Sequence, residues 1–159
     1  MAELTIEKSV TINRPADDVY GFIADEKNSM KFRRNVHSVE HLGDGKVKSV
    51  RRHFGRRIEV EGNVKADPQS RKVTFTGHAK TNHGPEATTN TQTVTPRGDS
   101  SSTLTVRTVA EIGDPPAAVR DHIEKVTAHE LESNLEHLKH LLEAPEGFHE
   151  SLDQHFVNA

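Results

Sequence analysis

Apolar and polar residues alternate over most of the first 112 positions, which is the pattern of strands that bury one face. The first run covers 4–13, and six further runs follow it. Turn residues such as Gly43-Asp44-Gly45 separate neighbouring runs, and short turns join antiparallel strands. The pattern predicts an antiparallel meander with strands near 4–13, 36–42, 46–54, 56–66, 72–79, 87–95 and 102–112.

Three other segments have the helical period of 3.6 residues. Pro15 stands in the first turn of a short helix, where its missing N–H costs nothing, and Asp17 and Asp18 suit the positive end of that helix. A second short helix is predicted over 28–35. One long amphipathic helix is predicted over 115–143. The two short helices therefore follow the first strand, and the long helix follows the last one.

This order of elements predicts an α+β helix-grip fold, in which a curved sheet wraps a long C-terminal helix around a cavity. The segment 14–25 reads RPADDVYGFIAD, a strand end followed by a capped helix. Together with the order of elements it resembles the SRPBCC superfamily of START-like ligand-binding proteins, over residues 4–144. The superfamily includes polyketide cyclases/dehydrases. We expect a single ligand-binding domain over 1–145 and a short tail over 146–159.

Strand alternation also predicts which side chains face the covered side of the sheet. The apolar residues Val60, Phe75 and Val106 face inward by this rule. On the sixth strand the same rule carries Asn90 and Gln92 inward. The inner face therefore holds more polar atoms than a closed apolar core would tolerate, which favours an interior that contains water or ligand.

Two charged residues share the predicted inner face. On the third strand Val50 and Phe54 point inward and take Arg52 with them, and on the first strand Lys8 lies between apolar neighbours. An unpaired buried charge is costly, so an inward Arg52 needs a carboxylate or a ligand oxygen. The alternative is a bulge that turns Arg52 or Lys8 outward. A cavity arginine is proposed to polarise carbonyl groups in aromatase/cyclases of the superfamily. The resemblance implies such an arginine here, and Arg52 lies on the strand expected to carry it.

The long helix places Val126, Glu130 and Asn134 on one stripe, beside a second stripe of core leucines. If this stripe lines the cavity, Glu130 is a general base or the partner of Arg52, because desolvation raises a carboxyl pKa toward neutrality. The alternative places Glu130 at the solvent margin. His129 lies on an adjacent flank. The candidate catalytic residues are Arg52 and Glu130, and the candidate ligand-binding residues are Phe22, Phe32, Val50, Phe54, Val60, Phe75, Asn90, Gln92, Val106, Val126, His129 and Asn134.

Composition narrows the function classes. The 159 residues contain no cysteine, which excludes disulfides and cysteine nucleophiles, and only 4% are aromatic. Eleven histidines are present, but neither a His-Glu-x-x-His motif nor a local cluster of three ligands accompanies them, so no metal is expected. No phosphate-binding or dinucleotide-binding glycine motif occurs, so no cofactor is expected.

The charge is nearly balanced, with 21 basic and 24 acidic residues. The densest basic block, 46–57, contains a single aromatic residue for stacking a base, so a solvated hairpin explains it better than a nucleic-acid site. No apolar stretch is long enough to span a membrane. We expect a cytoplasmic protein, a monomer or homodimer, without a nucleic-acid partner.

These features predict an enzyme of natural-product metabolism, a cyclase or dehydratase that needs no cofactor. An aromatic-poor cavity with Thr, Asn and Gln suits a small, partly polar ligand better than a sterol or long lipid. The alternative is a carrier or sensor that binds such a molecule without catalysis. A third, weaker possibility is an interaction module that uses the basic hairpin.

Overall fold

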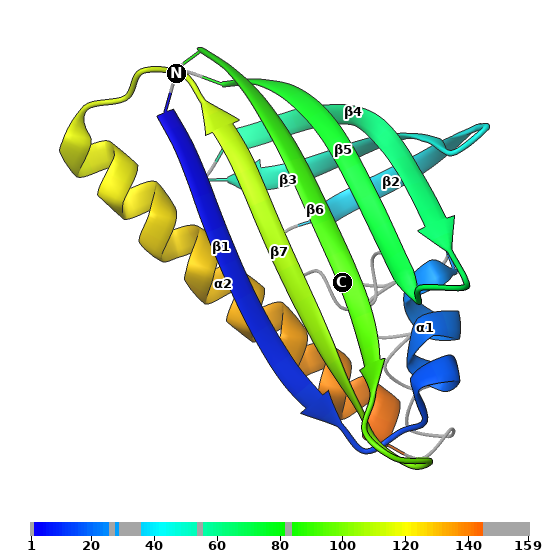
Figure 1. Ribbon diagram of the computed structural model, residues 1–159. Helices are drawn as coiled ribbons and strands as arrows, with labels where there is room; N and C mark the ends of the chain where they lie inside the picture. Colours follow the sequence, from blue (N-terminus) through cyan, green and yellow to red (C-terminus); the bar gives the residue numbers. More distant parts are fainter. Residues whose placement is uncertain (1, 26–27, 29–35, 54–55, 82–83, 145–159) are drawn as a thin grey trace.

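The computed structural model describes residues 2–25, 28, 36–53, 56–81 and 84–144. Its strands form one seven-stranded antiparallel sheet with the order β1-β7-β6-β5-β4-β3-β2 (Figure 1). The elements are β1 (Ala2–Ile12), α1 (Ala16–Ala24), β2 (Val36–Gly43), β3 (Lys46–His53), β4 (Arg56–Asp67), β5 (Lys72–Thr81), β6 (Gly84–Pro96), β7 (Ser102–Ile112) and α2 (Ala117–Glu143).

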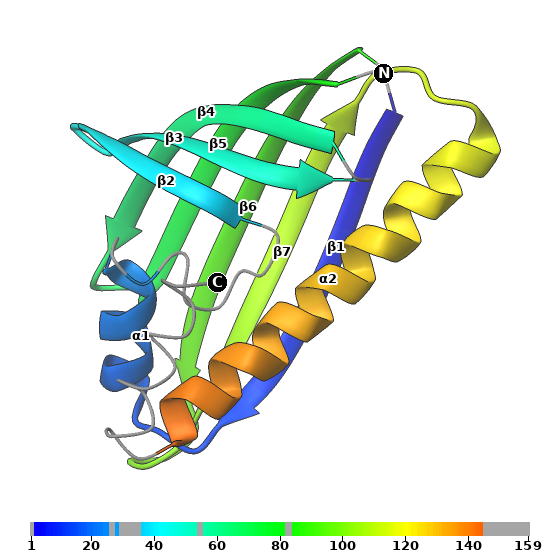
Figure 2. The same ribbon diagram turned by 180° about the vertical axis from the view of Figure 1, so that it is seen from behind.

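The sheet is curved, and both helices lie against it. In Figure 2, α2 runs beside β1, and the hairpin of β2 and β3 at the far edge curls toward the side on which α2 lies. The short helix α1 contacts β5, β6 and β7 at one end of the sheet. The predicted α+β helix-grip fold is therefore confirmed. The predicted short helix over 28–35 and the tail over 146–159 lie outside the described residues, apart from Asn28.

The apolar core lies where α1 and the last part of α2 meet the sheet. Ile12, Val19, Leu104 and Leu138 are fully buried there and belong to one cluster. Among the described residues of α2, the buried side chains all come from its C-terminal part, namely Leu135, His137, Leu138, Leu141 and Leu142. Leucines at helical spacing form this grip because one helix face must be apolar to pack on a sheet.

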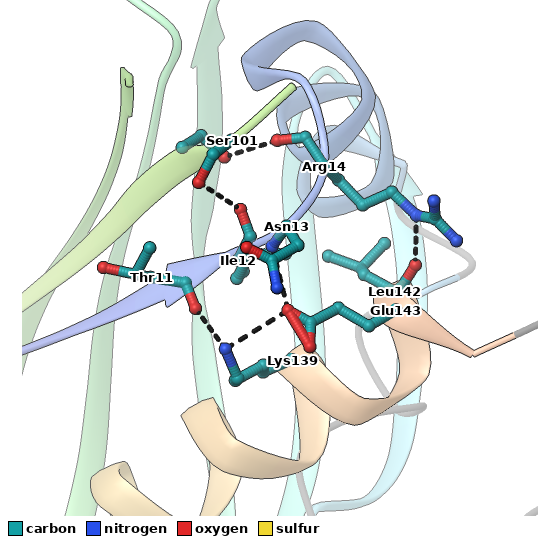
Figure 3. Close-up of polar contacts among 9 residues, drawn as sticks. Thr11, Ile12, Asn13, Arg14, Ser101, Lys139, Leu142 and Glu143 are labelled. Carbon is teal, nitrogen blue, oxygen red and sulfur yellow. Dashed lines mark hydrogen bonds and ion pairs between the residues drawn. The ribbon is translucent and has the colours of Figure 1, made fainter. Parts of the chain in front are cut away.

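Polar contacts hold the C-terminal end of α2 against the end of β1 and the turn that follows it (Figure 3). A helix end leaves carbonyl groups without intrahelical partners, and side chains from elsewhere satisfy one of them here. The hydrogen bonds run from Lys139 Nζ to the Thr11 carbonyl (2.6 Å), from Asn13 N–H to Glu143 Oε2 (2.8 Å), and from Arg14 Nε to the Leu142 carbonyl (2.6 Å). Beside them, Ser101 Oγ, from the turn between β6 and β7, donates to the Ile12 carbonyl (3.2 Å).

Two glycines face each other on the concave side of β4 and β5. Gly62 is directly opposite Gly77, and the ring of Phe75 lies close to both. A Cβ atom at Gly77 would lie 2.7 Å from Phe75 Cζ, and one at Gly62 would collide with the Thr76 carbonyl oxygen. Because neither glycine has a side chain, the Phe75 ring can lie against the point where the two strands approach each other closely.

Candidate functional site

A cavity of about 140 Å³ lies between the concave face of the sheet and α2. For comparison, a cavity of about 150 Å³ accommodates a benzene molecule. Apolar side chains from β4, β5, β7 and α2 form much of its wall, including Val60, Phe75 and Leu138. The polar side chains that reach it are Ser49, Arg51, Thr88, Asn90, Gln92 and Thr108 from the sheet, and Thr127, Glu130 and Asn134 from α2.

Arg51 brings a positive charge into this cavity from β3. Its Nη2 atom lies 2.8 Å from Oε1 of Glu86 on β6, and the two side chains are only 23% and 15% exposed. The hydroxyl of Thr88 lies 3.4 Å from the same carboxylate oxygen. The buried Nε of Arg51 has no hydrogen-bond partner among the described residues. Glu86 thus holds one end of the guanidinium group, and Nε–H remains available to another acceptor.

Glu130 faces this cation from α2. Burial raises the pKa of its carboxyl above the usual value of 4.5, although the positive charges of Arg51 and His129 act to lower it. The carboxyl is therefore desolvated and electrostatically coupled to Arg51, and it retains its proton to higher pH than an exposed glutamate does.

A smaller space of about 60 Å³ continues from this cluster toward β1 and the first half of α2. Leu4, Ile6, Ile112 and Ile123 line it and make it largely apolar. Five side chains border both spaces, namely Arg51, Thr88, Thr108, Thr127 and Glu130. The charged cluster therefore lies between two compartments rather than at the end of one.

Several residues proposed from strand and helix periodicity do line the cavity. They are Val60, Phe75, Asn90, Gln92, Val106, Glu130 and Asn134. Lys8 reaches α2 from the inner face of β1 and forms an ion pair with Glu132, with Nζ 2.6 Å from Oε1. Periodicity succeeds here because these elements bury one face without interruption. The roles of these side chains toward a ligand remain predictions.

The predicted inward position of Arg52 is wrong. Ser49 is opposite Val60 and Arg51 is opposite Ile58, so the odd-numbered residues of β3 face the cavity. Arg52 is exposed on the other face. The error has a physical reason: Val47 and Val50 are both buried although they lie on opposite faces of β3, so apolar identity does not reveal the phase of this strand.

Other predicted ligand-binding residues lie away from the cavity lining. Val50 shares the face of Arg52, and the half-buried Phe22 packs against the main core from α1. Val126 is half-buried on α2 and His129 is exposed, and neither lines the cavity. Phe32 and Phe54 lie outside the described residues.

Arg51, Ser49, Glu86 and Thr127 are cavity or ion-pair residues that sequence reasoning did not select. Glu86 shares the parity of Asn90 and Gln92, but it precedes the predicted start of its strand. Thr127 is one turn before Glu130 and Leu131, so the helical stripe contained the signal. For Arg51, no comparable sequence pattern indicated a position at the cavity.

The described residues hold no group of three or more His, Cys, Asp or Glu side chains that could bind a metal ion. In the same part of the chain, neither helix has both the length and the apolar character needed to cross a membrane.

Comparisons with known proteins agree with this architecture. The model of the family described as "Polyketide cyclase / dehydrase and lipid transport" matches residues 3–143. Among curated proteins none matches. Three solved structures that resemble this chain are between 15% and 21% identical to it in sequence. Likeness at this level of identity shows the fold alone.

The Zhui aromatase/cyclase from Streptomyces sp. R1128 is 16% identical, with a TM-score of 0.78, and the match covers 89% of this chain and 94% of that one. A START superfamily protein from Mycobacterium smegmatis is 15% identical, with a TM-score of 0.72 and coverages of 87% and 97%. The di-domain ARO/CYC BexL from the BE-7585A biosynthetic pathway is 21% identical, with a TM-score of 0.72 over 92% of this chain. This chain spans 48% of the BexL chain.

Proposed function

Because the chain belongs to the polyketide cyclase/dehydrase and lipid transport family, within the START-like SRPBCC superfamily, we propose that it binds a small, partly polar hydrophobic molecule in the cavity. We propose further that it acts on this molecule as a cyclase or dehydratase of natural-product metabolism, without a cofactor. The observation that carries the proposal is that Arg51 and Glu130 line one cavity and are electrostatically coupled there.

Arg51 supplies the electrophilic group of the proposed reaction. Its unpaired Nε–H donates to a ligand carbonyl oxygen and stabilises the negative charge that develops when this carbonyl becomes an enolate. A hydrogen bond of this kind is stronger in a cavity shielded from water. Glu86 holds Nη2 and so keeps the guanidinium group oriented before the ligand arrives.

Glu130 transfers the proton. Its carboxylate removes a proton from the carbon next to the polarised carbonyl, the C–H electron pair moves into the C–C bond, and the charge moves to the oxygen at Arg51. In a cyclisation, the enolate carbon then attacks a second carbonyl of the ligand, whose oxygen takes the proton from Glu130. In a dehydration, the enolate electrons form a C=C bond as the C–O bond to a β-hydroxyl breaks, and the hydroxyl leaves as water with the proton of Glu130. Both roles benefit from a pKa raised toward neutrality.

A simple ketone tests this chemistry without the natural substrate. α-Tetralone in deuterated water exchanges the hydrogens next to its carbonyl through the enolate, and NMR measures the rate. We expect the protein to accelerate this exchange, and Arg51→Met and Glu130→Gln each to reduce the acceleration about 100-fold or more. Arg52→Met removes the adjacent exposed cation, and Glu136→Gln removes an exposed carboxylate of α2, so both serve as matched controls that retain activity.

The same experiment distinguishes the alternative function, a carrier or sensor. The apolar wall formed by Leu131, Leu135 and Leu138 favours binding without chemistry. If α-tetralone raises the melting temperature but its exchange is not accelerated, or if both active-site variants exchange it as fast as the unmodified protein does, the catalytic assignment is wrong and the carrier function stands. A cytoplasmic location and a monomeric or homodimeric state remain predictions.

A further inference from the structure

A chain of side-chain hydrogen bonds crosses the cavity wall from β6 to β7. Gln92 Nε2 donates to Asn90 Oδ1 at 3.4 Å, and Asn90 Nδ2 lies 2.9 Å from Thr108 Oγ1. Gln92 is only 6% exposed, and its Oε1 has no hydrogen-bond partner among the described residues. The three side chains, called the amide relay below, therefore end in a buried oxygen that can only accept.

This oxygen is placed at the border between cavity and core. Gln92 is flanked across the sheet by Val73 and Val106, and the next inward residue of β6 is the buried Val94. An apolar side chain at position 92 would continue this core without leaving a buried polar atom unpaired, which is costly. A glutamine that costs stability at this position is best explained by a partner that enters the cavity.

The relay extends along the cavity wall from the neighbourhood of the Arg51–Glu86 ion pair. Thr108 borders both compartments together with Arg51, whereas Asn90 and Gln92 line only the larger one. Phe75 and Leu131 line the larger cavity beside Asn90 and Gln92. A ligand that contacts both Arg51 and Gln92 therefore needs two polar groups joined by an apolar body.

We propose that the amide relay is a specificity site for a ligand hydroxyl group, remote from the ligand carbonyl or carboxylate that Arg51 holds. The hydroxyl donates its hydrogen to Gln92 Oε1, and Asn90 and Thr108 keep the amide of Gln92 turned to receive it. The inference rests on the proposed function only in that it assigns the cavity to a ligand. It names the ligand class: a small, mainly apolar acid or ketone with a distal hydroxyl.

Three benzoates test the proposal by calorimetry on the full chain. Benzoate offers the anionic end alone, 4-hydroxybenzoate adds a donor at the far end, and 4-methoxybenzoate adds a group that cannot donate. We expect the 4-hydroxy compound to bind about tenfold more tightly than the other two, as one hydrogen bond in a buried site allows.

Gln92→Met is expected to abolish this tenfold preference, to leave binding of benzoate unchanged, and to unfold at the same or a higher temperature without ligand. If Gln92 had a merely structural role, the substitution would instead lower the melting temperature and weaken the binding of all three compounds alike. Thr108→Val, which releases Asn90, is expected to reduce the preference and provides a second variant should Gln92→Met not fold. Thr89→Val, at an exposed position on the outer face of β6, should retain it.

Each outcome decides between the proposals. If the preference persists in both relay variants, or if the methoxy compound binds as tightly as the hydroxy compound, the relay does not recognise a hydroxyl. If the carboxylates bind in an Arg51-dependent manner without any preference, the relay inference fails and the proposed cavity function stands. If the preference is present but α-tetralone exchange is not accelerated, the catalytic proposal fails and the relay inference stands. If none of the benzoates binds, the relay inference is overturned, and the α-tetralone experiment decides the proposed function.

Discussion

Two adjacent arginines of β3 lie in different environments. Arg51 points into the cavity, where Glu86 pairs with it and Glu130 is electrostatically coupled to it, whereas Arg52 is exposed to solvent on the opposite face. A cation in a shielded cavity interacts more strongly with carboxylates and carbonyl oxygens than a cation surrounded by water does. At the scale of single residues, the burial of the guanidinium group therefore separates the candidate catalytic arginine from its neighbour.

The raised pKa of Glu130 makes a prediction about stability. The folded protein binds the Glu130 proton more tightly than the unfolded chain does, so this residue lowers stability as pH rises from about 4.5, its ordinary value, through its folded-state pKa. Glu130→Gln removes this contribution. Urea unfolding at several pH values between 4 and 8 should show the variant gaining stability relative to the unmodified protein as pH rises. A constant difference, or one that shrinks with pH, would contradict the desolvated position of Glu130.

At the scale of elements, the paired strands β4 and β5 shape one wall of the cavity. Their facing glycines, Gly62 and Gly77, leave the space beside which the Phe75 ring lies. The two glycines differ in what surrounds them. A methyl group at Gly62 would meet the backbone of β5 as well as the Phe75 ring. The three atoms nearest to a methyl group at Gly77 all belong to the side chains of Phe75 and Val60, and side chains can move.

Alanine substitutions should expose this difference. Gly62→Ala is expected to cost about 1–3 kcal/mol of unfolding free energy, because the strands must separate to accept the methyl group. Gly77→Ala is expected to cost less and to displace the Phe75 ring, so it should weaken binding of the benzoate probes instead. Urea denaturation and calorimetry together measure the two effects. Equal stability losses in the two variants would show that the spacing between β4 and β5 does not determine the cost of the added methyl group.

At the scale of the whole molecule, one end is closely packed and the other surrounds the cavity. The main core, helix α1 and the contacts in Figure 3 all lie near the C-terminal end of α2. In the first half of α2 the described side chains are exposed or half-buried, and Arg120 donates there to the Glu3 carbonyl at 3.1 Å. Stability is therefore expected to decrease along α2 from its C-terminus to its N-terminus.

Native-state hydrogen exchange tests this gradient. Amides in residues 135–142 are expected to exchange only on global unfolding, and amides in 121–128 through local opening. In agreement, Leu138→Ala should cost about 2–5 kcal/mol, because Leu138 is fully buried, and Ile123→Ala clearly less. Uniform protection along α2 would mean that the helix opens as one unit with the sheet.

Local patterns were sufficient to predict most of the architecture. Alternation of period two predicted all seven strands, and the leucine spacing predicted where α2 grips the sheet. These predictions succeeded because each element buries one face, and burial requires apolar side chains at the period of that element. The same rule placed Asn90 and Gln92 on the inner face and made Glu130 a candidate for the cavity, beside the alternative at the solvent margin; all three line the cavity.

By itself, the sequence therefore determined the fold, the family and a cavity with polar side chains. Only the tertiary structure decided which arginine enters that cavity, because β3 is buried on parts of both faces and its phase follows from its register with β4. It also decided that Arg51 meets Glu86, 35 residues away, and that the relay leaves Gln92 Oε1 unpaired among the described residues. These contacts depend on distances between side chains of separate elements, and no local periodicity encodes such distances.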